Sequence, residues 1–310
     1  MIERHTIQQN KTSSLSPHPA VAMRRPPSAA GGRRKAACLL SLLVLLFATP
    51  VAASEPPARV VSINLCLDQL VLALAAPGQV VAVSDMAHDP HLSAQWQAAQ
   101  ALPAVRVRVE EILAQRPDLV FLDAFAPSHV VGLLKRAGVR LAQFPEASTF
   151  DDGVARVRSL ATALGRPEAG ATLAQQMQER RAAPADGEHR PLAAVWQANG
   201  FSVGRGTLQD DLLRRAGFRN LAAERSAGPF EPLPLEALVR AAPELLILES
   251  PASDRPSLAE ALMTHRAARQ AFGTTRTLVM PHSLWLCAGP QNVAALDRLA
   301  AARRSLERRR

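Results

Sequence analysis

The chain has 310 residues, of which 48% are hydrophobic and 20% charged, a composition that can bury one large core or two ordinary ones and excludes a disordered or collagen-like chain. The formal net charge of +9 lies mostly at the two ends, because residues 54–310 carry 29 basic against 26 acidic side chains and the last eight, RRSLERRR, supply five of those basic groups. The body between the ends is close to neutral, which argues against a nucleic-acid-binding face.

A short apolar run near the N-terminus predicts export. Residues 36–48, AACLLSLLVLLFA, follow three basic residues and precede small residues at an A-x-A-like site. The run is shorter than the roughly 20 apolar residues that a membrane-spanning helix needs. We therefore predict a signal peptide over residues 1–53, cleaved after Ala53, and a periplasmic mature protein. An uncleaved anchor is the alternative, and either Met1 or Met23 is the true start.

Strands and helices alternate in the sequence pattern from residue 54 to residue 148. Runs of β-branched and apolar residues predict the strands, and apolar residues at helical spacing predict the helices. In chain order we expect strand 59–64, helix 67–76, strand 80–84, helix 109–116, strand 119–122, helix 128–137 and strand 139–144. This alternation predicts a parallel sheet covered on both faces, so residues 54–148 are assigned to an N-terminal α/β lobe.

Residues 149–184 have a helical pattern throughout, broken only at Gly165-Arg-Pro167, and are predicted to bridge two lobes. Alternation then resumes over residues 185–310. In chain order we expect strand 192–197, helix 207–216 capped by Thr207, helix 235–241, strand 245–248, strand 277–280 and helix 290–307. The predicted fold is α/β, with two doubly wound parallel-sheet lobes joined by a rigid helix and a ligand cleft between them.

The two predicted lobes share a sequence pattern. Residues 109–120, VEEILAQRPDLV, align with residues 235–246, LEALVRAAPELL, and both place a helix, a proline stop and a buried strand in the same order. The spacing between the copies is too long for a solenoid repeat and indicates two similar lobes.

Five segments carry a family resemblance. They are VVSINLCLDQL (60–70), EEILAQRPDLVFL (110–122), ALGRPEAG (163–170), GRGTLQDDLLRRAG (204–217) and LPLEALVRAAPELLIL (233–248). In these segments the sequence resembles the periplasmic binding proteins of vitamin B12 and ferric-siderophore importers. The resemblance runs from about Arg59 to Leu306. It implies a non-enzymatic protein that captures a small metal chelate and delivers it to the membrane subunits of an ABC importer and their ATPase.

The same resemblance implies a docking surface for the transporter. Family members dock through one surface glutamate on each lobe, and the matching positions here are Glu110 and Glu236. Both occupy the second position of an equivalent helix, where a carboxylate is also favoured by the helix dipole alone.

The ligand is expected at the carboxyl ends of the strands, so the loops that follow strands supply the candidate ligand-binding residues. These residues are Asn64, Leu65 and Cys66 after the first strand, Trp196, Phe201 and Arg205 around strand 192–197, and Trp285 and Cys287 after strand 277–280. Trp196, Phe201 and Trp285 would form an apolar platform, although each is equally compatible with a place in the core.

A corrinoid such as cobalamin is the first choice of ligand, because Arg205 is the only basic residue that the pattern places in an otherwise apolar cleft. A ferric siderophore or haem is the alternative. The chain has no tyrosine, which argues against a haem carrier that uses tyrosine as its iron ligand, and His88, His91 or His282 would have to replace it. We predict no resident metal and no cofactor.

Cys66 and Cys287 follow strands in opposite lobes, in a compartment where disulfides persist. They either form a disulfide that ties the lobes together or contact the ligand, and the sequence does not choose between these roles.

Two other classes of function remain open. An enzyme is one, although the chain has no G-x-S-x-G, H-E-x-x-H or phosphate-loop motif. A structural periplasmic protein without a small ligand is the other.

Overall fold

The computed structural model describes residues 55–180, 189–249, 266–273 and 276–310. Ser54–Arg310 form one compact unit, separate from Met1–Ala53. The predicted signal peptide, its cleavage site and both candidate start residues lie outside the described residues. Among the described helices, none is both long and apolar enough to cross a membrane.

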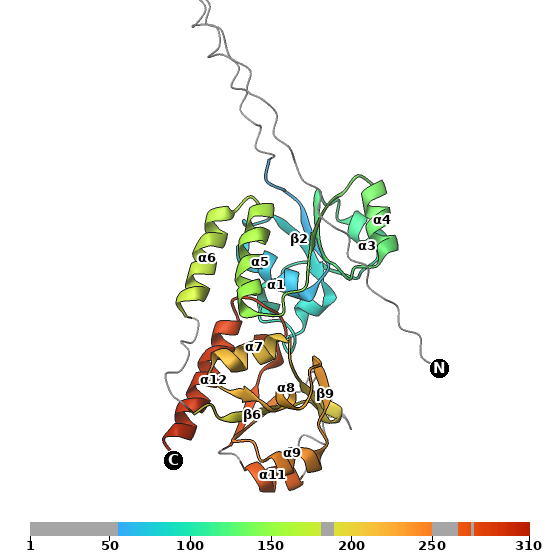
Figure 1. Cartoon of the computed structure of the whole chain (residues 1–310). Helices are drawn as coiled ribbons and strands as arrows, with labels where there is room; N and C mark the ends of the chain where they lie inside the picture. Colours follow the sequence, from blue (N-terminus) through green and yellow to red (C-terminus); the bar gives the residue numbers. More distant parts are fainter. Residues whose placement is uncertain (1–54, 181–188, 250–265, 274–275) are drawn as a thin grey trace, which may run out of the picture. The chain divides into compact units, whose positions relative to one another are not determined.

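The first lobe is built on a five-stranded parallel sheet of order β3-β2-β1-β4-β5 (Figure 1). Its strands are β1 (Val60–Ser62), β2 (Val80–Ser84), β3 (Ala104–Val105), β4 (Leu119–Asp123) and β5 (Arg140–Phe144). The helices that accompany them are α1 (Leu65–Leu74), α2 (Trp96–Ala99), α3 (Val109–Ala114) and α4 (Ser128–Arg136). Val60 and Phe121 pack with α1 in one core, whereas their neighbours Val61 and Val120 pack with α3 and α4 in another. The central strands β1 and β4 are mostly apolar because both faces of the sheet are covered there, whereas the edge strand β5 also carries the exposed Arg140 and Gln143.

The first strand is shorter than predicted and the first helix begins earlier, at Leu65 instead of Leu67. Asn64 causes both differences. Its side-chain oxygen accepts hydrogen bonds from the backbone N–H groups of Cys66 and Leu67, so it caps the helix and cannot continue the strand.

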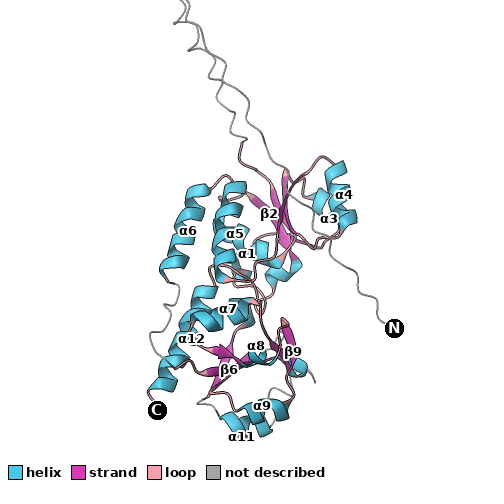
Figure 2. Cartoon of the chain, in the orientation of Figure 1, coloured by secondary structure: helices cyan, strands magenta, loops and turns pink. Residues whose placement is uncertain are grey.

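The second lobe contains a parallel sheet of order β11-β10-β6-β8 (Figure 2). Its strands are β6 (Leu192–Trp196), β8 (Arg219–Asn220), β10 (Leu245–Glu249) and β11 (Thr277–Met280), and its helices are α7 (Leu208–Arg215), α8 (Leu221–Arg225), α9 (Leu235–Ala241), α11 (Arg266–Phe272) and α12 (Asn292–Glu307). An antiparallel ribbon of β7 (Phe201–Val203) and β9 (Phe230–Pro232), which the sequence pattern did not indicate, is added at the carboxyl end of β6. The predicted fold class, two α/β lobes with parallel sheets, is confirmed.

The predicted bridging segment folds as two helices, α5 (Phe150–Ala163) and α6 (Pro167–Glu179), which lie side by side (Figure 1). They separate at Gly165, whose φ of +73° favours glycine, and Pro167 lies in the first turn of α6 as predicted. Gly170 permits close packing, because a Cβ there would overlap the methyl group of Ala161. The last residues of the predicted bridge, 181–184, lie outside the described residues.

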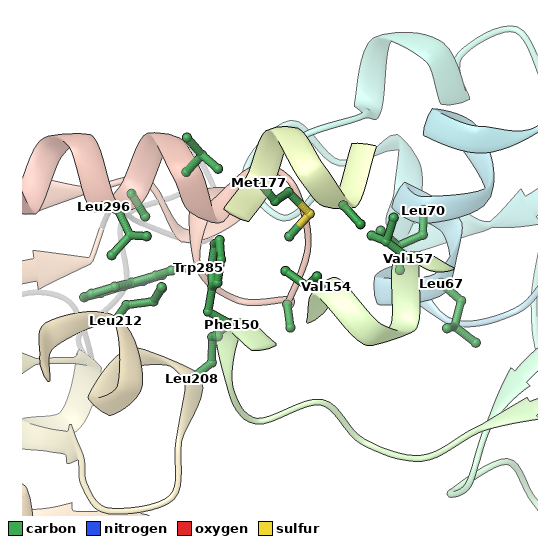
Figure 3. Close-up of a cluster of buried hydrophobic side chains, with 14 of the residues drawn as sticks. Leu67, Leu70, Phe150, Val154, Val157, Met177, Leu208, Leu212, Trp285 and Leu296 are labelled. Carbon is green, nitrogen blue, oxygen red and sulfur yellow. The ribbon is translucent and has the colours of Figure 1, made fainter. Parts of the chain in front are cut away.

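One hydrophobic core joins the two lobes (Figure 3). Side chains of α1, α5 and α6 form one part of it, and those of α7 and α12 form the other. Those labelled in Figure 3 are Leu67, Leu70, Phe150, Val154, Val157, Met177, Leu208, Leu212, Trp285 and Leu296.

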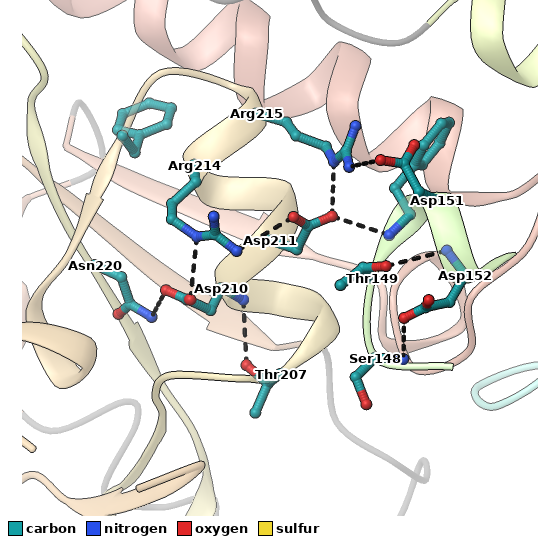
Figure 4. Close-up of polar contacts among 12 residues, drawn as sticks. Ser148, Thr149, Asp151, Asp152, Thr207, Asp210, Asp211, Arg214, Arg215 and Asn220 are labelled. Carbon is teal, nitrogen blue, oxygen red and sulfur yellow. Dashed lines mark hydrogen bonds and ion pairs between the residues drawn. The ribbon is translucent and has the colours of Figure 1, made fainter. Parts of the chain in front are cut away.

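A polar network also connects the start of α5 with α7 (Figure 4). The Asp211 carboxylate accepts a hydrogen bond from the Phe150 backbone N–H at 2.9 Å and another from Arg215 Nε at 2.6 Å. Arg215 in turn contacts Asp151, with 2.7 Å between nitrogen and oxygen. Core and network together fix α5 against the second lobe.

Candidate functional site

A disulfide bond brings the carboxyl ends of the two sheets together. Cys66 lies in the first turn of α1, just after β1, and Cys287 follows β11. Their sulfur atoms are 2.01 Å apart and their Cα atoms 5.1 Å apart. The structure thus contains the bridged form of the pair, in which neither sulfur is a free thiolate for a metal. Because ligands of open α/β sheets bind at the carboxyl ends of strands, this region is the candidate ligand-binding site.

Both tryptophans expected at the ligand lie elsewhere, which corrects the sequence prediction. Trp196 is 0% exposed, and its indole N–H donates a hydrogen bond to the Leu233 carbonyl at 3.0 Å. Trp285 is also 0% exposed and packs in the core shared by the lobes (Figure 3). Leu65 and Cys287 are buried as well, at 5% and 1% exposed. Large aromatic side chains such as these two indoles make more contacts when they are packed in a core than when they are exposed at a strand end.

Other apolar side chains are exposed at these strand ends. Phe125 follows β4 and is 74% exposed, and Met86 follows β2. On the ribbon of β7 and β9, Phe201 is 45% and Phe230 is 64% exposed. Of these four residues, only Phe201 was predicted as a ligand contact. A phenylalanine in the segment DAFAPS (123–128), directly after a buried strand, was a signal that could have identified Phe125.

Asn64 has a structural task at this site. Its side-chain Nδ2 donates a hydrogen bond to Asp123 Oδ2 at 2.6 Å, while its oxygen caps α1. Asp123 Oδ1 accepts a hydrogen bond from the Phe125 N–H at 3.0 Å. The two polar residues therefore hold the loop that presents Phe125.

A cluster of polar side chains marks the carboxyl ends of three neighbouring strands in the second lobe. Glu249 ends β10, His282 follows β11 and Gln197 follows β6. Glu249 Oε2 accepts a hydrogen bond from Gln197 at 2.8 Å and lies 3.2 Å from His282 Nδ1. This contact with Glu249 raises the pKa of His282 above its ordinary value. It also leaves Nε2 as the ring nitrogen available to a further partner.

The other two histidines considered as iron ligands, His88 and His91, lie near β2. The side chain of His88 is partly buried, with Nε2 3.1 Å from the Leu102 carbonyl oxygen, and His91 is also partly buried. In the part of the chain that the structure describes, no group of three or more His, Cys, Asp or Glu side chains is placed to hold a metal ion.

Arg205, a candidate ligand residue, is exposed, and its guanidinium donates a hydrogen bond to the Ala223 carbonyl at 2.6 Å. It lines a hollow beside the edge strand β8, together with residues that precede β6 and β8. The two candidate docking residues, Glu110 and Glu236, are both exposed and lie in the first turns of α3 and α9.

Comparisons with known proteins agree with this arrangement. A sequence model of the family described as "Periplasmic binding protein" matches residues 60–275. The cobalamin-binding protein of Halobacterium salinarum is 25% identical over 221 residues, which cover 69% of this chain and 60% of that protein, less than two thirds of its length. The vitamin B12-binding protein of Pectobacterium atrosepticum is 27% identical over 221 residues, covering 66% of this chain and 75% of that protein.

Among solved structures, the periplasmic haem-binding protein of Roseiflexus sp. RS-1, in its apo form, superposes with a TM-score of 0.67. It is 26% identical in sequence, and the superposition covers 80% of this chain and 98% of that one.

Proposed function

Because the chain belongs to the periplasmic binding protein family, we propose that it captures a metal chelate in the periplasm and delivers it to the membrane subunits of an ABC importer. Cobalamin is the proposed ligand. The observation that carries this choice is the similarity to two relatives that are named for binding cobalamin or vitamin B12.

The proposed contacts are the exposed aromatic side chains at the strand ends. Phe125 is presented by the first lobe, and Phe201 and Phe230 by the second. Burying one such ring under a ligand is worth about 1.5–3 kcal/mol. These three rings would therefore replace the two buried tryptophans as the main apolar contacts of the ligand.

Ligand identity is tested by thermal unfolding of the full chain, purified from the periplasm of a host, with cyanocobalamin, haem or ferrichrome added in turn. A ligand at about 100 times its Kd that binds only the native state adds about 2.7 kcal/mol, or a shift in Tm of roughly 5–10 °C. We expect this shift with cyanocobalamin. A shift with ferrichrome alone would indicate that the ligand is a ferric siderophore and not cobalamin. No shift with any of the three compounds would contradict the binding function.

The contact residues are tested in the same assay. Phe125→Ala and Phe230→Ala should each weaken cobalamin binding about tenfold and leave the Tm of the free protein unchanged, because both side chains are exposed. The control is Leu133→Ala on α4, which removes another exposed apolar side chain, 39% exposed, away from the strand ends. Equal effects of all three substitutions would contradict the proposed site.

Haem is a second candidate, favoured by the similarity to the Roseiflexus haem-binding protein and by the Glu249–His282 pair. A carboxylate that holds Nδ1 orients the ring and leaves Nε2 for iron, as is usual for metal-binding histidines. If haem is the ligand, His282→Gln should change the visible absorption spectrum of the complex and weaken it, whereas cobalamin binding would not depend on this nitrogen.

Docking is proposed to use Glu110 and Glu236, one exposed carboxylate per lobe at equivalent helix starts. The double substitution Glu110→Ala/Glu236→Ala should leave ligand affinity intact and abolish stimulation of the importer's ATPase in reconstituted membranes. Glu168→Ala is the matched control, because Glu168 is also an exposed carboxylate in the first turn of a helix, α6. ATPase stimulation that persists in the double variant would place the docking surface elsewhere.

A further inference from the structure

Four arginines from separate elements line one hollow of about 460 Å³ in the second lobe. The hollow lies along the edge strand β8, between α7 and α8, and its charged lining residues are Arg190, Arg205, Arg214, Arg219, Asp210 and Glu224. The body of the chain is nearly neutral, so four guanidinium groups around one hollow are a local concentration of charge and do not reflect an overall excess.

Two of the four arginines are held in place without a carboxylate partner among the described residues. Arg190 donates hydrogen bonds to the carbonyl oxygens of Arg214 and Phe218, at 3.2 and 3.0 Å. Arg205 donates to the carbonyl oxygen of Ala223. All three bonds use Nη2, so the remaining N–H groups of each guanidinium can bind a further acceptor.

The other two arginines are paired with the two acidic groups of the lining, and Arg214 also contacts Asp211, a carboxylate outside the lining that is itself paired with Arg215. Asp210 has a side chain that is 4% exposed, and it is bound by Arg214 at 3.2 Å. Glu224 accepts two hydrogen bonds from Arg219, at 2.7 and 2.8 Å. These pairs neutralise two of the four positive charges and leave a formal excess of two, carried by Arg190 and Arg205.

We propose that this hollow binds the phosphate group of a phosphate monoester. Such a group carries a charge of about −1.5 to −2 at pH 7 and has three acceptor oxygens, which match the uncompensated charge and the free guanidinium donors. A carboxylate would neutralise only one of the two charges. The volume exceeds that of the phosphate alone, so the hollow has space for part of the attached molecule, either a soluble phosphate ester or a lipid headgroup.

Gly206, in the same lining, is exposed. Its φ is +82°, and a Cβ there would meet no atom within 4 Å, so the residue faces open space. The backbone beside Arg205 is accessible to a ligand as a result.

The proposal is tested by calorimetric titration of the full chain, free of chelate, with inorganic phosphate and with glycerol 3-phosphate in 150 mM NaCl. Arg190→Gln/Arg205→Gln should raise the Kd for both at least about tenfold, because charge-assisted hydrogen bonds are lost. The charge-matched control Arg240→Gln/Arg266→Gln, on exposed positions of α9 and α11, should leave the Kd within about twofold, since it removes the same net charge away from the hollow.

Arg190→Lys/Arg205→Lys keeps the charge but loses the fork, so it should bind phosphate with intermediate affinity even if the glutamine variant does not fold. Whether the phosphate group belongs to a soluble ester or to a lipid headgroup is tested by co-sedimentation with two kinds of phosphatidylcholine vesicle, one of which contains phosphatidic acid. Binding to glycerol 3-phosphate but not to the vesicles indicates a soluble ester, and arginine-dependent binding to the acidic vesicles indicates a headgroup. No binding of either probe, or equal losses in the hollow and control variants, would overturn the proposal.

Discussion

Asp68 is a completely buried carboxyl group in the first lobe, on α1 two residues after the disulfide cysteine. The hydroxyl and the backbone N–H of Ser84, at the end of β2, both donate hydrogen bonds to it. Burial raises the pKa of Asp68 from 3.8 to about 7, against the opposing effect of these hydrogen bonds. The folded protein therefore keeps a proton on Asp68 between about pH 4 and pH 7, whereas the unfolded chain releases it.

This difference makes stability depend on pH. A raised carboxyl pKa in the folded state means that the contribution of Asp68 is fully present below about pH 4 and is lost as the pH rises through 7. Asp68→Asn, which is neutral at every pH, should raise the free energy of unfolding at pH 8 by on the order of 2–4 kcal/mol and change it little at pH 4. Urea unfolding at both pH values measures this, and an equal change at both would contradict a titrating Asp68.

At the scale of elements, α5 and α7 are joined by the buried carboxylate of Asp211. Its side chain is 8% exposed and contacts Arg214, Arg215 and the first backbone N–H of α5 (Figure 4). A buried charge in this position is stabilised because both of its oxygens accept hydrogen bonds. Thr149 caps the same helix end, because its hydroxyl oxygen accepts a hydrogen bond from the Asp152 backbone N–H. The start of α5 is therefore fixed from two sides.

Asp211→Ala should lower the free energy of unfolding by about 2–4 kcal/mol, because the Phe150 N–H loses its acceptor and Arg214 and Arg215 each lose one of their two carboxylate partners. The control is Asp297→Ala, which breaks an exposed ion pair with Arg180 at 2.7 Å and should change stability by less than about 1 kcal/mol. Chemical unfolding of both variants compares them. Similar losses would show that burial of Asp211 does not determine its effect.

At the scale of the whole molecule, the two lobes are joined in three ways: by the shared core, by the Asp211 network and by the disulfide. The disulfide closes a loop with a sequence separation of 221 residues. Cross-links over long loops restrict the unfolded chain, and their removal typically costs about 2–5 kcal/mol. We expect small motions of the lobes, since the disulfide lies at the carboxyl ends of both sheets.

Cys66→Ser/Cys287→Ser should therefore lower the free energy of unfolding by about 2–5 kcal/mol. Treating the parent protein with a reducing agent should give the same decrease, and the double variant should not respond to reduction. Urea unfolding of the four samples is the measurement. A parent protein that is insensitive to reduction would contradict a stabilising role for the bridge.

The local pattern of the sequence was sufficient for most elements of the fold. Apolar runs identified β2, β4 and β10 closely, because strands buried on both faces are mostly apolar, and the apolar run of the edge strand β11 identified it as well. The ribbon of β7 and β9 was missed, since three-residue strands have no period to detect and form only through each other.

The residues of the candidate ligand-binding site were harder to predict from the sequence. The pattern identified the strand ends as its location, because topology alone requires ligands there. It assigned Trp196 and Trp285 to the ligand and overlooked Phe125 and Phe230, because exposure depends on which helix covers each residue.

The two-lobed α/β architecture could be predicted from the alternation of strands and helices and from the repeated helix-Pro-strand pattern. The bond between Cys66 and Cys287, the aromatic rings that reach solvent and the arginines that share a hollow became apparent in the folded structure. The reason is that periodicity records which face of an element is buried, whereas these properties depend on contacts between residues far apart in the chain.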